Sequence, residues 1–367
     1  MNFQEYTSCF EDLEHTPTKL KAIRYTIDKA LEQNDWNNAL KLYYEFVNED
    51  AQYQDCYQAI LLFPEYIAFF EKHPECWERH QFYMRNAYTR IIHHITAFYQ
   101  VPLQEIIEIY HQYKDFCIHF NYGELDYYME LFWFFWDFGF VPQFGIASIE
   151  ECYQTAKKYM NKNRINRNRA CELDFDVLYL LYFKGDIKAA LQKAAPILEG
   201  KLYASHIPHT TYASFSEVYF EHGDWEQALV YSDKAYRLNE RDFSDLGSMY
   251  YTSERIMHLA YIDLPQALKL FRRKLPIYSK SKDGIDNFRF YNASYRLMAE
   301  LEKSGQQEIH LKFPYVSEPI YNDKGVYNVA KLKDFFYQRA KVIANRFDER
   351  DGNKHFHTQL TKEYRQR

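Results

Sequence analysis

The stretch Glu221-His222-Gly223-Asp224-Trp225-Glu226-Gln227-Ala228-Leu229 is typical of a sharp turn between two antiparallel helices. A near copy, Asn34-Asp35-Trp36-Asn37-Asn38-Ala39-Leu40, stands near the start of the chain, and weaker copies follow at Gly185-Asp186 and Ile262-Asp263. The aspartate of such a turn can cap the second helix by accepting a hydrogen bond from a free backbone N–H at its start. A turn that recurs in this way predicts a chain of helical hairpins.

The spacing of the turn aspartates indicates a repeat. Asp186 and Asp224 are 38 residues apart, and Asp224 and Asp263 are 39 apart. Asp35 precedes Asp186 by 151 residues, which is close to four such repeats. The arithmetic predicts seven or eight helical hairpins in register, and a two-helix repeat of this length is typical of an α-solenoid.

Apolar residues recur at helical spacing along most of the chain. The expected helices cover 17–33, 36–49, 53–72, 75–99, 103–120, 125–138, 148–160, 170–184, 187–198, 209–222, 225–238, 244–261, 264–278, 286–303 and 329–347. Pro64 is expected to bend the helix over 53–72 or to divide it in two. Residues 312–326 are expected to form a loop or a short hairpin, the helix 329–347 to cap the open end of the solenoid, and the tail 354–367 to be frayed.

Three regions follow from this pattern: residues 1–160 with divergent hairpins, residues 161–305 with regular repeats, and residues 306–367 with a loop, a capping helix and a polar tail. Two charged phrases leave alternatives open. The basic run 157–169 is either a solvated loop between helices or a patch for an acidic partner. The charged phrase 346–353 is either a glycine-stopped helix end with paired charges or a recognition turn toward a partner.

Composition excludes several functional classes. The net charge of −6 lacks the basic excess of a nucleic-acid-binding protein, so we expect no direct nucleic-acid partner. The six cysteines form no Cys-x-x-Cys pair, which favours buried thiols in a reducing cytoplasm. The start of the chain shows no pattern of a signal peptide. The aromatic run 131–141 is too short to span a bilayer, and we expect a buried helix there; an aromatic contact to a membrane or partner is the alternative.

The turn motifs resemble those of the tetratricopeptide repeat family, a helix–turn–helix unit with Gly-Asp at the turn, an aromatic residue next, and a small residue three positions later. Gly223-Asp224-Trp225 with Ala228 fits this pattern, and Asp35-Trp36 with Ala39 fits it as well. The repeats here are longer than the family's 34 residues, and the glycine usual in the first helix is Ser216 in the best copy. The resemblance implies a right-handed α-solenoid whose concave groove, lined by the first helix of each hairpin, binds a peptide or a protein segment.

Carried over by position, the groove has an aromatic layer beside an acidic one, which suits a peptide with apolar anchors and a basic residue. Packing between repeats is the competing interpretation of the aromatic residues, and exposure to solvent is the competing interpretation of the polar ones. The residues predicted to bind a peptide or partner are Tyr179, Tyr182, Glu217, Phe220, Asn292, Tyr295 and Arg296.

No pattern in the sequence indicates catalysis. A Gly-rich phosphate loop, a His-Glu-x-x-His helix and a nucleophile elbow are all missing from it. His206 and His209 have a two-histidine spacing, but Pro208 and the lack of a nearby carboxylate on the same turn argue against a metal site there. We therefore expect a protein that is not an enzyme and that needs no metal or cofactor. In length, composition and repeat type the chain is similar to intracellular peptide-sensing regulators of Gram-positive bacteria.

The leading hypothesis is thus a cytoplasmic regulatory or sensor module that binds a peptide or protein through its groove. No helix-turn-helix DNA-binding unit is evident among the first helices, and we expect no membrane insertion. The alternative hypothesis is a structural or assembly adaptor that forms a homo-oligomer through its C-terminal helix, 329–347.

Overall fold

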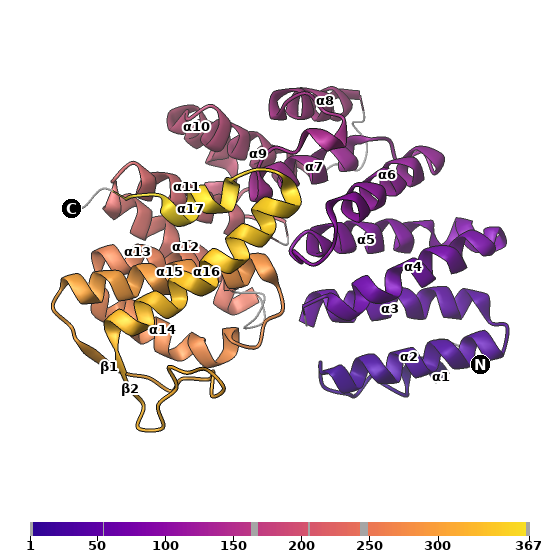
Figure 1. The fold of residues 1–367 in the computed structure, drawn as a ribbon. Helices are drawn as coiled ribbons and strands as arrows, with labels where there is room; N and C mark the ends of the chain where they lie inside the picture. Colours follow the sequence, from indigo (N-terminus) through magenta and orange to yellow (C-terminus); the bar gives the residue numbers. More distant parts are fainter. Residues whose placement is uncertain (1–2, 54, 163–167, 205, 243–248, 365–367) are drawn as a thin grey trace. The chain divides into compact units, whose positions relative to one another are not determined.

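The computed structural model describes residues 3–53, 55–162, 168–204, 206–242 and 249–364. These residues form helices α1 to α17 and a single pair of short strands, so the expectation of an all-α protein is confirmed (Figure 1). The chain divides into two compact units, Met1–Tyr159 and Met160–Arg367, with the division in the last turn of α8.

The first unit is a series of helices joined by short connections. Its elements are α1 (Phe3–Thr7), α2 (Pro17–Glu32), α3 (Trp36–Tyr53), α4 (Tyr57–Lys72), the 3₁₀ turn η1 (Pro74–Cys76), α5 (Trp77–Ile95), α6 (Leu103–His119), α7 (Leu125–Phe138), the 3₁₀ turn η2 (Pro142–Phe144) and α8 (Ile149–Lys162). Helix α3 packs against α2, α4 and α5, and α5 packs in turn against α4, α6 and α7. Each helix therefore covers the apolar face of its neighbours in the sequence.

The helix with Pro64 and the aromatic run both lie in this unit. Helix α4 continues without a break through Pro64, so the proposed division into two helices is wrong. The aromatic run lies in α7, where Leu131, Phe132 and Phe135 are each at most 1% exposed. The prediction of a buried helix there is confirmed, because this helix places most of its rings inside the unit.

The second unit holds the more regular part of the sequence. Its elements are α9 (Arg169–Leu178), the π-helical turn η3 (Tyr179–Phe183), α10 (Ile187–Leu198), α11 (His209–Glu221), α12 (Trp225–Asp242), α13 (Met249–Ile262), α14 (Leu264–Tyr278), α15 (Gly284–Lys303), β1 (Glu308–His310), β2 (Val326–Asn328), α16 (Val329–Asp351) and α17 (His355–Thr361). The two strands pair antiparallel, with Ile309 opposite Tyr327. The sequence predicts a helix from residue 244, and the described part of that helix, α13, begins at Met249; residues 244–248 lie outside the described part.

The turns form as their sequences predict. Gly223 has φ +78°, the left-handed conformation that ends α11, and the N–H of Asp224 donates to the carbonyl of Tyr219 at 2.9 Å. Asn34 takes the same left-handed role with φ +55°. In all four turns the aspartate side chain accepts a hydrogen bond from the backbone N–H three residues later; the donors are Asn38, Ala189, Gln227 and Gln266. The expected aspartate caps are therefore confirmed.

Small residues allow the helices of each hairpin to approach closely. The alanine after each turn is completely buried; these residues are Ala39, Ala190, Ala228 and Ala267. In the best copy, Ser216 of α11 donates a hydrogen bond of 2.8 Å to the carbonyl of Ala228 on α12. In this unit α9 also packs on α11, α11 on α13, and α13 on α15, so one layer of helices is continuous (Figure 1).

The predicted register between the two halves is wrong. The turn at Asp35 joins α2 to α3, and the turn at Asp186 joins η3 to α10, so seven helices, α3 to α9, lie between them. Four hairpins would place eight helices there. The helix that follows the turn motif is therefore odd-numbered in the first unit (α3) and even-numbered in the second (α10, α12 and α14). The count differs because the helices between Asp35 and Asp186, with their connections, are longer on average than those of the regular repeats.

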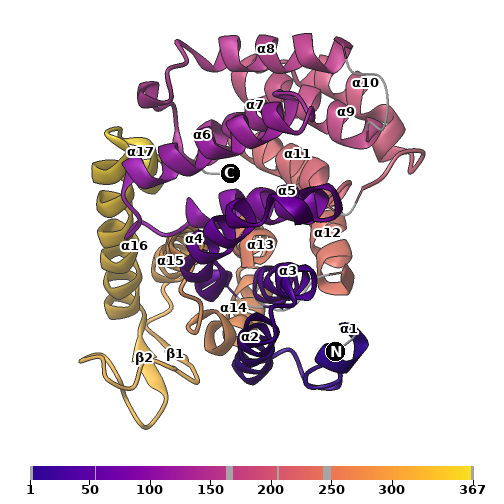
Figure 2. The ribbon, with the colours of Figure 1, turned by 90° about the vertical axis from the view of Figure 1, so that its right-hand side faces the viewer.

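The C-terminal region also differs from its prediction. Helix α16 packs along α15, with β1 and β2 at its N-terminal end and α17 at its other end (Figure 2). The sequence predicts a frayed tail over 354–367, but residues 355–361 form α17, and Phe356 and Leu360 are 1% and 2% exposed. These apolar side chains hold α17 in the second unit, which explains the difference; residues 365–367 lie outside the described part.

Candidate functional site

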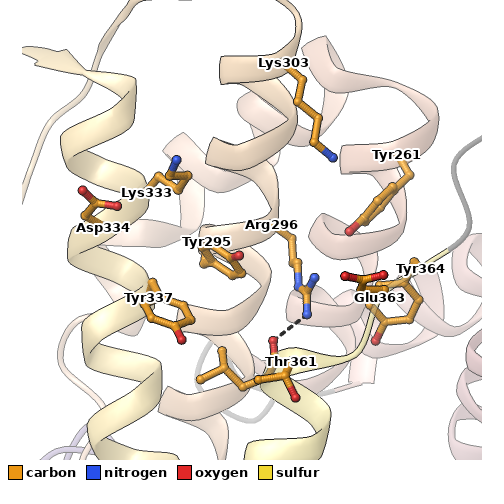
Figure 3. Close-up of a pocket in the computed structure, with 11 residues that line it drawn as sticks. Tyr261, Tyr295, Arg296, Lys303, Lys333, Asp334, Tyr337, Thr361, Glu363 and Tyr364 are labelled. Atoms are coloured by element: carbon orange, nitrogen blue, oxygen red, sulfur yellow. Dashed lines mark hydrogen bonds between the residues drawn. The ribbon is translucent and has the colours of Figure 1, made fainter.

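The C-terminal tail, defined here as Leu360–Tyr364, lies on side chains of α11, α13 and α15. The Nη2 atom of Arg296 on α15 donates to the backbone carbonyls of Leu360 at 2.6 Å and Lys362 at 2.8 Å. Figure 3 shows the guanidinium directed at the end of α17, with Tyr364 beside it. The guanidinium also lies 5.4 Å from the centre of the Tyr364 ring. One cationic side chain thus holds both the main chain and a ring of the tail.

Two further contacts position tail side chains. Lys362 forms an ion pair with Glu221 at the end of α11. The ring of Tyr364 lies 5.0 Å from the ring of Phe220 and 5.8 Å from that of Tyr261 on α13, distances typical of aromatic pairs. We call the set Phe220, Glu221, Tyr261 and Arg296 the tail surface. It combines a guanidinium that donates to main-chain carbonyls, a carboxylate and two rings.

A pocket of about 660 Å³ adjoins the tail surface (Figure 3). Its lining includes the side chains of Tyr261, Tyr295, Arg296, Lys303, Lys333, Tyr337 and Tyr364. Lys303 and Lys333 form ion pairs of 2.6 Å with Glu300 and Glu302, so these two cations are already neutralised. The buried Nε of Arg296 has no hydrogen-bond partner among the described residues. The pocket therefore extends the tail surface with polar walls and ring faces.

Carboxylates gather beside the ion pair of Lys362. Burial, and after it the charge of Glu221, raises the pKa of Glu217 to about 7, while the Tyr182 hydroxyl, which donates to Glu217 at 2.5 Å, and Lys362 act in the opposite direction. Burial and the charge of Glu217 raise the pKa of Glu254 well above its ordinary value. Because these carboxylates repel one another, this part of the surface favours a cation.

Removal of the tail lysine is expected to change the titration of this cluster. Lys362 lowers the pKa of Glu217, so Lys362→Met should raise the pKa of Glu217 further above 7. A titration of the glutamate side-chain carboxyls by ¹³C NMR measures this shift. Lys333→Met, which removes a lysine paired with Glu302, is the matched control and should leave the titration of Glu217 unchanged. An unchanged pKa in Lys362→Met would show that the lysine is not held beside the cluster.

The residues predicted from the sequence fall into two groups. Phe220 and Arg296 belong to the tail surface, Tyr295 lines the adjoining pocket, and Tyr182 and Glu217 bond to each other beside it. Tyr179 and Asn292 are buried in the interior, at 4% and 7% exposed, and lie outside the tail surface as defined above. The burial of Tyr179 favours the competing interpretation of the aromatic residues, which is packing between repeats.

The sequence did not indicate several residues that contact the predicted binding residues or line the same pocket. Tyr261, Lys362, Tyr364 and Tyr337 were not singled out, although all four lie at the tail surface or in its pocket. One pattern could have indicated the tail: a basic residue followed two positions later by an aromatic, which matches the peptide chemistry expected for the groove. Its place in the groove could not be predicted, because the tail is far from its partners along the chain.

The other singled-out features carry no site in the described residues. The charged phrase 346–353 is the end of α16, where Arg350 pairs with Asp351 and Gly352 has φ +66°. Of the basic run 157–169, residues 163–167 lie outside the described part. In the part of the chain that the structure describes, no group of three His, Cys, Asp or Glu residues could hold a metal ion. None of the described helices is both long and apolar enough to cross a membrane.

The first unit has a smaller apolar pocket of about 330 Å³ between α4, α5 and α6. Phe70, Trp77, Met84, Tyr88 and Phe116 are among its lining residues. Glu71 and Asp115 also line it, and no segment of the described chain is shown bound in it as the tail is bound on its surface. It is therefore the weaker candidate.

The described geometry defines an all-α protein in which a chain segment is bound on the side chains of neighbouring helices. Comparison with known proteins found no matching family model, no matching curated protein and no matching solved structure. The function must therefore be argued from the contacts of the tail surface and from the turn motifs.

Proposed function

We propose that this chain is a tetratricopeptide-like right-handed α-solenoid that binds a peptide or protein segment on its concave face. It acts without catalysis, as a regulatory or sensor module in the cytoplasm. The six cysteines occur as free thiols, which supports a reducing compartment. The regulator class of Gram-positive bacteria remains the nearest analogy for a chain of this size and repeat type.

The helix order supports the repeat part of this proposal. From α9 to α15 each first helix packs on the second helix of its hairpin and on the next first helix. The buried alanines and the aspartate caps occur at the same place in each of these hairpins. Stacked hairpins of this kind build extended binding surfaces from one stripe of each first helix.

One observation carries the binding part: the surface already holds a peptide segment of its own chain. Lys362 has φ −58° and ψ 126°, an extended conformation, and Arg296 binds the carbonyls on both sides of Thr361. Main-chain recognition of this kind does not depend on the side chains of the bound segment. The carboxylate and the rings of the tail surface then add selectivity for a basic and an aromatic residue.

A binding experiment tests the proposal. The probe is a fluorescent peptide with the sequence of residues 360–367, titrated into the full chain carrying Tyr364→Ala, in which the aromatic anchor of the tail is missing. We expect saturable binding with a dissociation constant on the order of 10–100 μM. A second substitution, Glu221→Lys, should weaken binding at least tenfold, since it replaces the carboxylate that pairs with lysine. If the peptide fails to bind at millimolar concentration, the proposed function is wrong.

Tyr179 and Tyr182 are two of the residues predicted to bind a peptide, so their joint replacement by alanine is one test of the groove. The structure makes this pair unsuitable, because Tyr179 is 4% exposed and Tyr182 is bonded to Glu217, so the double substitution would disturb the core. The self-association hypothesis is also less favoured. Most apolar residues of α16, including Leu332, Phe336 and Phe347, are buried within the second unit, while Val342 on the same helix is 57% exposed.

A further inference from the structure

We propose that the C-terminal tail is an internal ligand of the tail surface, and that the external ligand is a segment with a basic residue two positions before an aromatic one, which binds by displacing the tail. This inference rests on the proposed peptide-binding function and adds the identity of the competitor and the chemistry of the partner. The surface would then be accessible only when the tail is released.

The tail is attached in two parts that differ in strength. The start of α17 belongs to the core: Asp348 accepts hydrogen bonds of 2.9 Å from the N–H groups of Phe356 and His357, and the Phe356 ring stacks on Phe347 at 4.5 Å. Beyond Leu360 the chain is held by the contacts of the tail surface. Thr361 and Glu363 are exposed. Release of the last residues therefore leaves the start of α17 in place.

The contacts of Lys362 define the basic position of the ligand. Glu217, Glu221 and Glu254 place three carboxylates on α11 and α13. The other titratable and charged groups that face them are Tyr182 on η3, Tyr250 on α13, Arg289 on α15, and Lys362 and Tyr364 of the tail. Among the described residues, the cations that lower the pKa of Glu217 are Arg289 of the scaffold and Lys362 of the tail. A ligand that displaces the tail must bring a positive charge of its own, since otherwise the carboxylates lose a counter-ion.

The contacts of Tyr364 define the aromatic position. Its ring lies against Phe220, which is 1% exposed, against Tyr261 and beside the Arg296 guanidinium. An aliphatic side chain would lose the two ring pairs and the cation–π contact. Glu363 stands between the two anchors and is exposed, so this middle position places no demand on the ligand.

Because the tail belongs to the same chain as its surface, it lowers the apparent affinity of an external peptide more than a free competitor would. A segment tethered by a short connection has an effective concentration on the order of millimolar, so even a weak internal ligand occupies its site most of the time. The apparent affinity of an external peptide is reduced by the fraction of molecules whose surface is open. Weakening of the tail should therefore increase external binding without any change in the scaffold.

The experiment compares the wild-type full chain with the full chain carrying Tyr364→Ala, using the fluorescent peptide of sequence 360–367 as probe. We expect the variant to bind the probe at least tenfold more tightly than the wild type. A probe peptide in which the lysine and tyrosine are replaced by glutamate and alanine should bind neither protein. Lys362→Glu, which repels Glu221 and keeps the tyrosine, is a second opened variant in case Tyr364→Ala does not fold.

The outcomes separate the two proposals. Equally tight binding by the wild type and both variants would refute the internal-ligand proposal while it leaves the binding surface intact. Absence of binding by all three proteins would refute the proposed function and this inference together. Equal binding of the two probe peptides would refute the basic and aromatic requirement alone. Hydrogen exchange of residues 362–364, faster in the variants than in the wild type, would support release of the tail directly.

Discussion

Phe220→Ala is expected to lower the free energy of unfolding of the second unit by about 3–5 kcal/mol. The ring is 1% exposed and is surrounded by Trp225 at 4.8 Å, His258 at 4.3 Å and Tyr261 at 5.4 Å. Truncation would leave a cavity between α11 and α13 that the rigid helices cannot fill. Urea denaturation, with hydrogen exchange of residues 209–221 as its readout, measures the change in the free energy of unfolding of this unit.

Tyr203→Ala is the matched control, because this aromatic side chain in the same unit is 78% exposed. We expect it to change the free energy of unfolding by less than about 0.5 kcal/mol. A loss below 1 kcal/mol in Phe220→Ala would contradict the packing described for this ring. The same experiment shows why Phe220 is a poor test of ligand recognition: its replacement removes part of the core together with the floor of the tail surface.

Asp351→Ala is the second substitution with a large expected effect, a loss of about 3–5 kcal/mol in the free energy of unfolding. Arg350 and Asp351 pair at 2.7 Å through Nε and Oδ1, and their side chains are 4% and 0% exposed. Burial raises the pKa of Asp351 although Arg350 opposes it, as expected for a pair that loses hydration on folding. Loss of the carboxylate leaves the buried guanidinium without this neutralising charge.

The double substitution Arg350→Met with Asp351→Leu tests this reasoning, since it removes both buried charges and keeps the volume. We expect its stability to lie within about 1 kcal/mol of the wild type, or above it. Asp323→Ala, at an exposed aspartate, is the control and should be nearly neutral. Chemical denaturation of the three variants measures the differences. A double variant as unstable as Asp351→Ala would show that the pair, and not its desolvation, determines the effect.

Much of the secondary structure could be predicted from the sequence. The helix over 264–278 has the predicted bounds, and the caps at Asp224 and Asp263 form as expected. These features depend on interactions within one or two helical turns, such as the hydrogen bond from Gln227 N–H to Asp224. Both partners of such a hydrogen bond therefore lie within the same few residues of sequence.

The candidate site was predicted only in part. The structure brings Phe220, Tyr295 and Arg296, three of the predicted binding residues, to one surface, because a helix of known phase determines which side chains share a face. The same reasoning placed Tyr179 there, but the chain takes a π-helical turn from Tyr179 to Phe183, which changes the direction of its side chains. The four-hairpin estimate failed for a related reason: the length of a segment does not reveal how many helices it contains.

The sequence by itself determined the helices, their turns and their buried small residues, because each depends on neighbours a few positions away. Only the tertiary structure decided which helices stack and where the tail lies. Arg296 binds a carbonyl 64 residues away, and the lysine that pairs with Glu221 is 141 residues away. Contacts of this separation form only after the hairpins have packed, since the packed helices create the surface that the tail occupies. The turn at Gly223-Asp224-Trp225 directly follows Phe220 and Glu221, the two residues of α11 that contact the tail.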